Sequence, residues 1–223
     1  MNSTFVCLAN SRKNSGRCIA GKEIGSSHWI RPVSNRITEE ISEIEMRYEN
    51  GIIPKLLDIV KFEIIEKKPN RFQVENYLLD PKYYWTKTGE FEPSRLGELC
   101  DDSSKMWPNL VSSYQGINDR APSSICDQYA HSLVLLELEE SKIIVRTEGA
   151  EFNNPKRKVR FQFAINTKVY LLPVTDPEIE RSYLAKPNNE YIINGTHYAT
   201  ISMGLPHSDA FCYIFAAGII CDE

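Results

Sequence analysis

The sequence of 223 residues contains six cysteines, but no two of them have the C-x-x-C spacing of a zinc ribbon. Cys7, Cys18 and Cys212 stand inside apolar runs, where a reduced thiol behaves as a small hydrophobe. We therefore predict reduced cysteines, no metal site and no cofactor.

Long apolar runs are also missing. The longest, Phe211 to Cys221, is far shorter than the ~18 residues that a transmembrane helix requires. The first residues do not show the basic-then-apolar pattern of a signal peptide. These absences predict a cytoplasmic protein with no membrane partner, and they leave its oligomeric state open.

Catalytic motifs are scarce as well. The four histidines form neither H-x-x-x-H nor H-E-x-x-H, and G-x-S-x-G does not occur. A cysteine–histidine pair stays open, because such partners can be distant in sequence. The residue patterns therefore assign no catalytic residue and favour a binding protein over an enzyme.

The charge that is present is unevenly distributed. The net charge is -4, which argues against a uniformly basic surface, and 42% of the residues are hydrophobic, enough for one sizeable core or two small ones. Residues 1–36 hold six Lys or Arg and one Glu, whereas residues 37–50 hold five Glu and one Arg. This asymmetry predicts a basic surface beside an acidic helix face, unless the two segments interleave and cancel.

The first third of the chain reads as strands with one interposed helix. The range 37–51 has helical spacing of Ile37, Ile41, Ile44 and Tyr48, with Thr38 as N-cap and Gly51 beyond the C-terminus. Pro32 suggests a sheet edge or the end of a strand. The predicted strands are 4–9, 17–24, 28–34, 56–65 and 72–80.

The last third repeats this pattern. Two hairpins are expected, one turning at Glu140-Ser141 and one at Asn194-Gly195. A helix should begin at Asp176-Pro177, because Asp is a good N-cap and Pro fits the first helical position. Further strands are predicted over 159–172 and 211–221.

We therefore predict a mainly β fold with minor helices, built as two OB-like barrels in tandem. The first barrel covers 1–80, an irregular connector covers 81–128, and the second barrel covers 129–223. A single larger mixed β structure is the alternative.

Several separated motifs follow one another along the chain: "LANSRKNSGRCIAG", "HWIRPVS", "LLDIV", "FQVENYLLD" and "ISMGLPHSDAFCYIFAAGII". Together they resemble the dual OB-containing domain family. The resemblance spans nearly the whole chain. It implies a pair of OB-type barrels that bind nucleic acid within a prokaryotic conflict or defence system, with other defence proteins as further partners.

The candidate anion-binding loop is "NSRKNSGRC". Cations, hydroxyls and backbone N–H groups bind phosphates, and Gly16 allows close backbone approach or a positive φ. The predicted contacts are Ser11, Arg12, Lys13, Ser15 and Arg17. The alternative is an ordinary solvated turn.

Trp29 and Arg31 share one face of a predicted strand, an arrangement that can stack a base and hold its phosphate. Ser34 could add a hydrogen bond. Alternatively, Trp29 belongs to the core and Arg31 lies over it.

Secondary ligand contacts are predicted in two other places. Amide and carboxylate groups that could read base edges, or simply face water, are Gln73, Glu75 and Asn76. A second basic cluster comprises Lys156, Arg157, Lys158 and Arg160. The leading functional prediction is nucleic-acid binding; the alternatives are a small-nucleotide or modified-base sensor or enzyme with a closed pocket, and a protein-binding adaptor.

Overall fold

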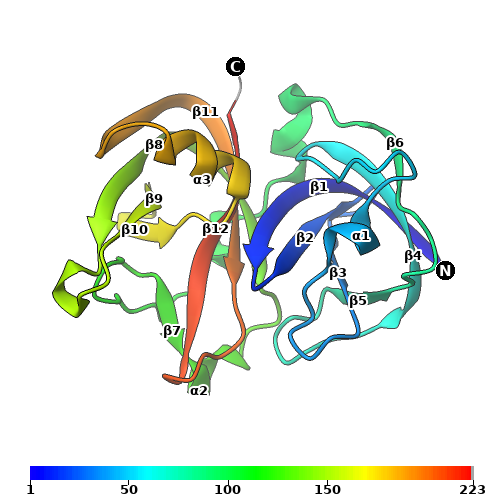
Figure 1. Ribbon diagram of the computed structural model, residues 1–223, viewed down its shortest axis with the longest axis horizontal. Coiled ribbons are helices and arrows are strands. Elements are labelled where there is room, and N and C mark those ends of the chain that lie inside the picture. Colours follow the sequence, from blue (N-terminus) through cyan, green and yellow to red (C-terminus); the bar gives the residue numbers. More distant parts are fainter. Residues whose placement is uncertain (222–223) are drawn as a thin grey trace. The chain divides into compact units, whose positions relative to one another are not determined.

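The computed structural model describes residues 1–221, which form two compact, mainly β units (Figure 1). Unit 1 comprises Met1–Cys100 and Ala130–Leu133; unit 2 comprises Asp101–Tyr129 and the chain from Val134 onward. The predicted limits 1–80, 81–128 and 129–223 stay predictions, and the last two residues of the third range lie outside the described part of the chain.

Unit 1 is a closed five-stranded barrel with a sixth strand at its edge. The strand order is β1-β2-β3-β5-β4, and β4 pairs again with β1 to close the ring. β3 and β5 pair in parallel, and α1 stands between β3 and β4 in the chain. The elements are β1 (Asn2–Lys13), β2 (Gly16–Glu23), β3 (Trp29–Val33), α1 (Glu43–Met46), β4 (Asp58–Lys67), β5 (Asn76–Leu79), β6 (Thr86–Glu90) and the 3₁₀ helix η1 (Pro93–Leu99).

The barrel interior is filled by residues that alternate along its strands. In β4, Val60, Phe62 and Ile64 are buried, whereas the residues between them are partly exposed. The ring of Phe5 packs edge-on against Phe62, with the ring centroids 5.7 Å apart. The period of two places one face of each strand in the core, which confirms the strand character predicted for 56–65.

The predicted helix over 37–51 is wrong in extent. Only Glu43–Met46 is helical, and Ser42 is its N-cap in a capping box with Glu45. Glu39 has φ 62, a left-handed conformation that interrupts any helix from Thr38. The side chains of Ile37 and Ile44, predicted to face the core, are exposed.

Unit 2 has the same strand neighbours as unit 1, with β8 to β12 as the counterparts of β1 to β5, but its sheet is closed by fewer contacts. Its sheet runs β10-β9-β8-β11-β12-β7. After β10, Val174 forms a parallel bridge with Ala216 of β12, the counterpart of the β3–β5 pairing. The elements are η2 (Ser103–Lys105), β7 (Arg120–Pro122), α2 (Ser123–Cys126), β8 (Leu133–Glu148), η3 (Ala150–Phe152), β9 (Lys156–Ile165), β10 (Lys168–Pro173), α3 (Pro177–Leu184), β11 (Asn189–Met203) and β12 (Phe211–Cys221).

Both hairpins predicted in the last third are wrong, because each is one continuous strand. β8 passes straight through Glu140-Ser141, and β11 passes through Asn194-Gly195. Gly195 has φ 82 inside β11, so the glycine serves a local irregularity in a long strand rather than a reversal. The turn preference of these short segments was outweighed by the pairing of β8 and β11 with their neighbouring strands.

The predicted helix start at Asp176 is confirmed. Its carboxylate accepts hydrogen bonds from the backbone N–H groups of Glu178 (2.9 Å) and Ile179 (3.2 Å), and Pro177 occupies the first turn of α3. The helix again stands between the third and fourth strands of its unit. Among the described residues, no helix has the length and apolar character needed to cross a membrane.

Candidate functional site

The predicted anion-binding loop is the tip of the β1–β2 hairpin. The last register pair is Lys13 with Gly16, and Asn14, with φ 50, and Ser15 form the two-residue turn. The side chain of Arg12 is exposed and that of Lys13 is partly exposed. Ser11 is instead buried, and its hydroxyl donates to the carbonyl of Cys18 at 3.4 Å.

The second half of the hairpin is held against the segment before α1. The backbone N–H of Arg17 donates to the carbonyl of Ile41 at 2.8 Å, and the guanidinium lies 3.2 Å from Glu43. A Cβ on Gly16 would lie 2.5 Å from the Ile41 carbonyl oxygen. Gly16 is therefore needed for close backbone approach at this contact.

The three predicted residues at β3 differ in exposure. Trp29 is partly exposed, with the ammonium of Lys22 5.4 Å from its ring centroid. Arg31 and Ser34 are each only 2% exposed. The backbone N–H of Arg31 donates to the carbonyl of Glu75 at 2.8 Å, so β3 meets the β4–β5 loop here.

A buried polar cluster lies beneath this surface. Nη1 of Arg31 lies 3.1 Å from Oε1 of Glu75 and donates to Oδ1 of Asn76 at 3.4 Å. The hydroxyl of Ser132 also donates to Glu75. The members of the polar cluster, each buried, are Arg31, Glu39, Gln73, Glu75, Asn76 and Ser132.

The amide of Asn76 holds the rest of the polar cluster together. Its nitrogen donates to Oε1 of Gln73 at 3.4 Å and to Oε2 of Glu39 at 3.5 Å. Glu39 also accepts from Asn70 at 3.2 Å. These hydrogen bonds anchor the β4–β5 loop to β3 and to the segment before α1.

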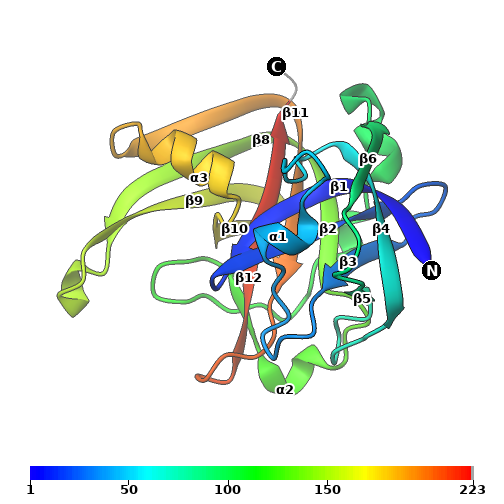
Figure 2. The ribbon, with the colours of Figure 1, turned by 45° about the vertical axis from the view of Figure 1, so that its right-hand side comes forward.

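Three segments of unit 1 are therefore in contact one after another: the β1–β2 hairpin, the segment before α1 and the β4–β5 loop. The hairpin tip contacts Ile41, and Glu39, two residues earlier, contacts Asn70 of the β4–β5 loop. In Figure 1 and Figure 2, α1 lies beside the β1–β2 hairpin, and the segment leading into α1 joins the two loops. The residues predicted at 11–17, 29–34 and 73–76 are thus brought together in one unit.

The second basic cluster lies in unit 2, and Arg157 and Arg160 of this cluster are bonded to other parts of the unit. Arg157 hydrogen-bonds the carbonyl of Leu184 at 2.8 Å, Oδ1 of Asn188 at 2.8 Å and the carbonyl of Lys186. It therefore satisfies carbonyl groups at and beyond the C-terminus of α3. Lys156 and Lys158 are exposed.

Arg160, predicted as a ligand contact in the second basic cluster, is buried. Its guanidinium binds Glu148 through two hydrogen bonds of 2.7 and 2.9 Å, and Arg146 donates to the same carboxylate at 2.8 Å. Burial alone would raise the pKa of Glu148, but these arginines outweigh it and the pKa lies below its ordinary value. The guanidinium of Arg160 is therefore occupied by a carboxylate on the neighbouring strand β8.

Unit 2 also contains a serine–histidine contact that no sequence motif indicated. Oγ of Ser141 lies 2.7 Å from Nε2 of His197, and Nδ1 lies 2.8 Å from the carbonyl of Gly195. The carbonyl can only accept, so Nδ1 carries a proton. Both side chains are at least 97% buried, which keeps substrate from the hydroxyl.

Residues 3–219 match the family model described as the dual OB-containing domain. The chain belongs to this family. The searches of curated proteins and of solved structures returned no match. The two barrel-like units, with equivalent strand orders, are what the name of the dual OB-containing domain family leads one to expect.

OB folds bind ligands on the face of strands 2 and 3 and on the loops joining strands 1–2 and 4–5. In this member of the dual OB-containing domain family, these are β2, β3, the hairpin tip and the loop between Lys67 and Asn76. Ala20 and Lys22, in the second half of β2, are only 1% exposed, whereas Gly16, Arg17 and Cys18 at the hairpin end are partly exposed. The accessible part of the surface is therefore its loop end.

Sequence reasoning missed two members of the polar cluster, Glu39 and Ser132, and Asn70, which donates to Glu39. Glu39 was assigned to a helix face, and Asn70 was passed over as part of a polar loop. Ser132 reaches Glu75 across 57 positions of sequence, and no local pattern signals that contact. A signal for Glu39 did exist, because Ser42 and Glu45 have capping-box spacing and place the helix start after it.

Proposed function

We propose that this protein binds nucleic acid through unit 1, using the β1–β2 hairpin tip and the β4–β5 loop, with Trp29 as a further contact opposite Lys22, near the other end of β2. The observation that carries the proposal is the cation content of the two loops that OB folds use for oligonucleotides. They contain Arg12, Lys13, Arg17, Lys68 and Arg71.

Phosphate groups would be bound by the exposed cations of these loops, and the partly exposed ring of Trp29 would stack a base. The binding is mainly electrostatic, so it weakens steeply as salt is added. Each cation that contacts a phosphate contributes roughly one to the slope of log affinity against log salt.

Arg31 has a positioning role in this proposal, because its buried guanidinium is occupied by Glu75 and Asn76. Its pairing holds the β4–β5 loop next to β3. Gln73, Glu75 and Asn76 act in the same way, since their side chains face the polar cluster. Direct contact with nucleic acid is left to the loop cations and Trp29.

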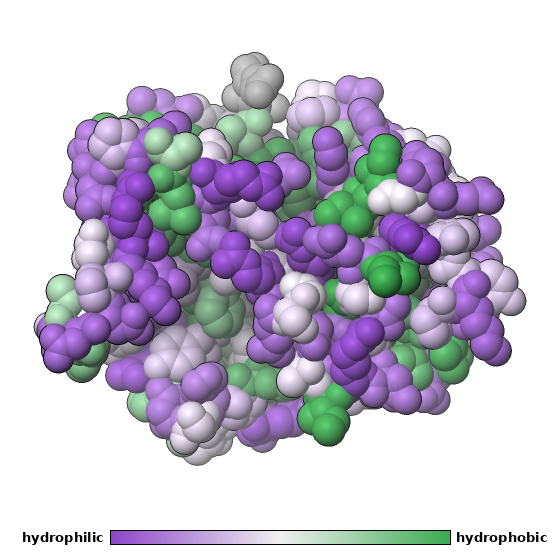
Figure 3. All heavy atoms as spheres, in the orientation of Figure 1, coloured by the Kyte–Doolittle hydropathy of each residue, from purple (hydrophilic) through white to green (hydrophobic). Residues whose placement is uncertain are grey.

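The alternative of a protein-binding adaptor calls for a large exposed apolar patch. On the face of the molecule in Figure 3, hydrophilic residues predominate and hydrophobic ones stand in small separate groups. This distribution favours a polar ligand. Action within a prokaryotic defence system is proposed on the family resemblance alone.

The test is filter binding with single- and double-stranded RNA and DNA at two salt concentrations. We expect the triple variant Arg12→Ala, Lys13→Ala, Arg17→Ala to bind at least about tenfold more weakly, with a smaller salt slope. The double variant Lys156→Ala, Lys158→Ala removes exposed cations of unit 2 and should change affinity far less. Unchanged affinity in the triple variant would overturn the proposal.

A further inference from the structure

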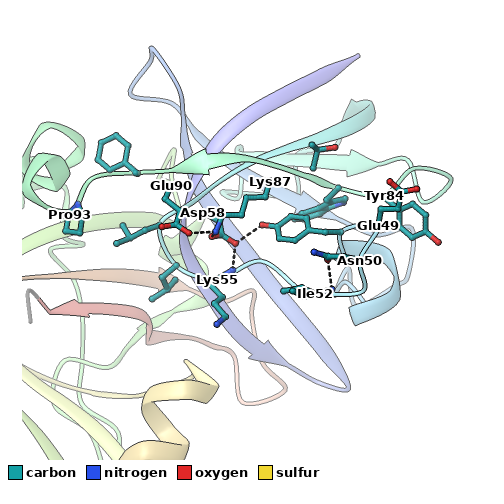
Figure 4. A pocket seen from close by; sticks show the side chains of 15 residues that line it. Glu49, Asn50, Ile52, Lys55, Asp58, Tyr84, Lys87, Glu90 and Pro93 are labelled. Atoms are coloured by element: carbon teal, nitrogen blue, oxygen red, sulfur yellow. Dashed lines mark hydrogen bonds and ion pairs between the residues drawn. The ribbon is translucent and has the colours of Figure 1, made fainter.

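A cavity of about 1000 Å³ lies in unit 1 between the chain segments 48–58 and 84–93 (Figure 4). The charged groups at its centre are paired with one another. The ammonium of Lys87 lies 2.7 Å from the carboxylate of Asp58 and also pairs with that of Glu90. Because these groups are engaged within the protein, we assign no ligand to this cavity.

Two aromatic side chains of unit 2, Tyr114 and Phe152, form an aromatic pair on its surface. Tyr114 is 76% exposed and Phe152 is 70% exposed. Their ring centroids lie 6.0 Å apart and the ring planes meet at 67°, which is an edge-to-face contact. Such a contact covers at most one face of one ring, so each ring of the aromatic pair keeps an open face.

The backbone that carries Tyr114 is held on both sides of this residue. Before it, the backbone N–H and the hydroxyl of Ser113 donate to the carboxylate of Asp119 at 2.7 and 2.6 Å. After it, the backbone carbonyl of Gln115 accepts from the guanidinium of Arg146 at 2.6 Å. The ring of Tyr114 therefore faces solvent from a fixed position, without the cost of ordering a flexible loop when a ligand binds.

Phe152 lies in the loop between β8 and β9, which projects beyond the ends of these strands in Figure 1 and Figure 2. The backbone N–H groups of Phe152 and Asn154 donate to the carbonyl of Gly149 at 3.1 and 2.9 Å. Gly149 has φ 81, and a Cβ there would lie 2.6 Å from the carbonyl oxygen of Asn154, so this turn requires glycine. The side chain of Gln115 donates to Glu151 at 2.9 Å and ties the loop to the segment that carries the other ring.

Exposed lysines stand on the strand that follows Phe152. They are Lys156 and Lys158. Lys158 is the register partner of Arg146, which binds Gln115 and also donates to Glu148, so the charge of this arginine is balanced. Two lysines attract a polyanion, but they are fewer than the loop cations of unit 1. We therefore expect stacking to outweigh charge at the aromatic pair, and the loss of both lysines to change affinity little.

We propose that the aromatic pair is a stacking surface for the bases of single-stranded nucleic acid. The class of ligand rests on the proposed function, but the residues and the main force differ from those of unit 1. Open aromatic rings beside cations are the arrangement with which proteins bind single strands without reading their sequence. The bases of a duplex already stack on one another, so the aromatic pair acts only on unpaired bases.

The experiment is filter binding of the full chain with oligo(dT) and oligo(U) of about 16 nucleotides and with duplexes of the same length. The double variant Tyr114→Ala, Phe152→Ala should bind the single strands about tenfold more weakly, with unchanged salt slope and unchanged duplex affinity. Phe152→Leu keeps an apolar side chain without an aromatic ring and should lose part of the single-strand affinity. Tyr83→Ala is the control and should bind as the wild type does, because Tyr83 is 56% exposed but lies in unit 1, outside the cation-rich loops.

A second measurement locates the contact on the chain. Oligonucleotides that carry 5-iodouracil are cross-linked to the protein by ultraviolet light, and the linked peptides are identified by mass spectrometry. We expect links to Tyr114 or Phe152. Links to Trp29 report separately on the site proposed in unit 1.

Four results would overturn the stacking proposal: unchanged single-strand affinity in the double variant, an equal loss of duplex affinity, full affinity in Phe152→Leu, or no link at the aromatic pair. If the triple variant of the hairpin cations binds as the wild type does while links still form at the aromatic pair, the proposed function of unit 1 is wrong and the stacking surface of unit 2 is supported. Weaker binding in the triple variant without links at the aromatic pair has the opposite meaning. The two sites can therefore fail independently.

Discussion

Units 1 and 2 use one strand order but close their sheets differently. In unit 1, the third and fifth strands share three parallel register pairs, from Arg31–Asn76 to Val33–Leu78. In unit 2, the corresponding strands meet at the single bridge of Val174 with Ala216. The short closure follows Pro173, which ends β10 and has no N–H to donate.

The pairs of charges buried in the two units are also placed differently. Arg31 and Glu75 lie where β3 meets the β4–β5 loop, so closure of the barrel and the shape of the ligand loop depend on the same contact. Arg160 and Glu148 link β9 to β8 within an antiparallel ladder, and Arg146 also donates a hydrogen bond to Glu148. We therefore expect the closed barrel of unit 1 to lose more stability than unit 2 when one buried charge is removed.

The largest expected effect is that of Arg31→Ala. It leaves the buried carboxylate of Glu75 without its cation, which should lower the free energy of unfolding by about 3–5 kcal/mol. Urea denaturation followed by tryptophan fluorescence measures this. Loss of nucleic-acid affinity should accompany it, because the β4–β5 loop would no longer be held to β3.

Arg160→Ala is the control in unit 2. Glu148 keeps the hydrogen bond from Arg146, so the cost should be smaller, about 1–3 kcal/mol. A cost for Arg160→Ala equal to or above that for Arg31→Ala would contradict this comparison.

The features predictable from sequence were those with a local cause. The cap at Asp176 and the strand alternation in β4 depend on neighbouring residues, and both are present in the structure. The hairpin predicted at Asn194-Gly195 is wrong because β11, paired with β8 and β12, continues through these residues.

The candidate site was predictable only in part for the same reason. The basic hairpin tip is visible as a run of residues. The burial of Arg31, by contrast, depends on Glu75 and Ser132, which are distant in sequence. The spacing of Trp29 and Arg31 predicts that they share one face of a strand, but it cannot indicate which residues cover that face.

A smaller effect is expected at the helix caps, which also differ between the units. Asp176→Ala removes two hydrogen bonds at the start of the eight-residue α3 and should cost about 1 kcal/mol of unfolding free energy. Ser42→Ala, at the four-residue α1, should cost less, because little helix depends on it. Thermal unfolding of both variants checks the order, and a larger loss for Ser42→Ala would show that the capping box also positions the segment beside the hairpin.

The smallest effect concerns acid stability of unit 2. Its arginines depress the pKa of Glu148 below the usual 4.5, so the ionised carboxylate stabilises the folded state above that value. This contribution should fade as pH falls below about 4.5 and through the lowered pKa, at a rate of at most roughly 1.4 kcal/mol per pH unit. Urea denaturation of the wild type and of Glu148→Gln from pH 7 to about pH 3 measures it. The stability difference between the two should shrink as the pH falls, and a constant difference would mean that the Arg160–Glu148 contact contributes little to the charge linkage of unit 2.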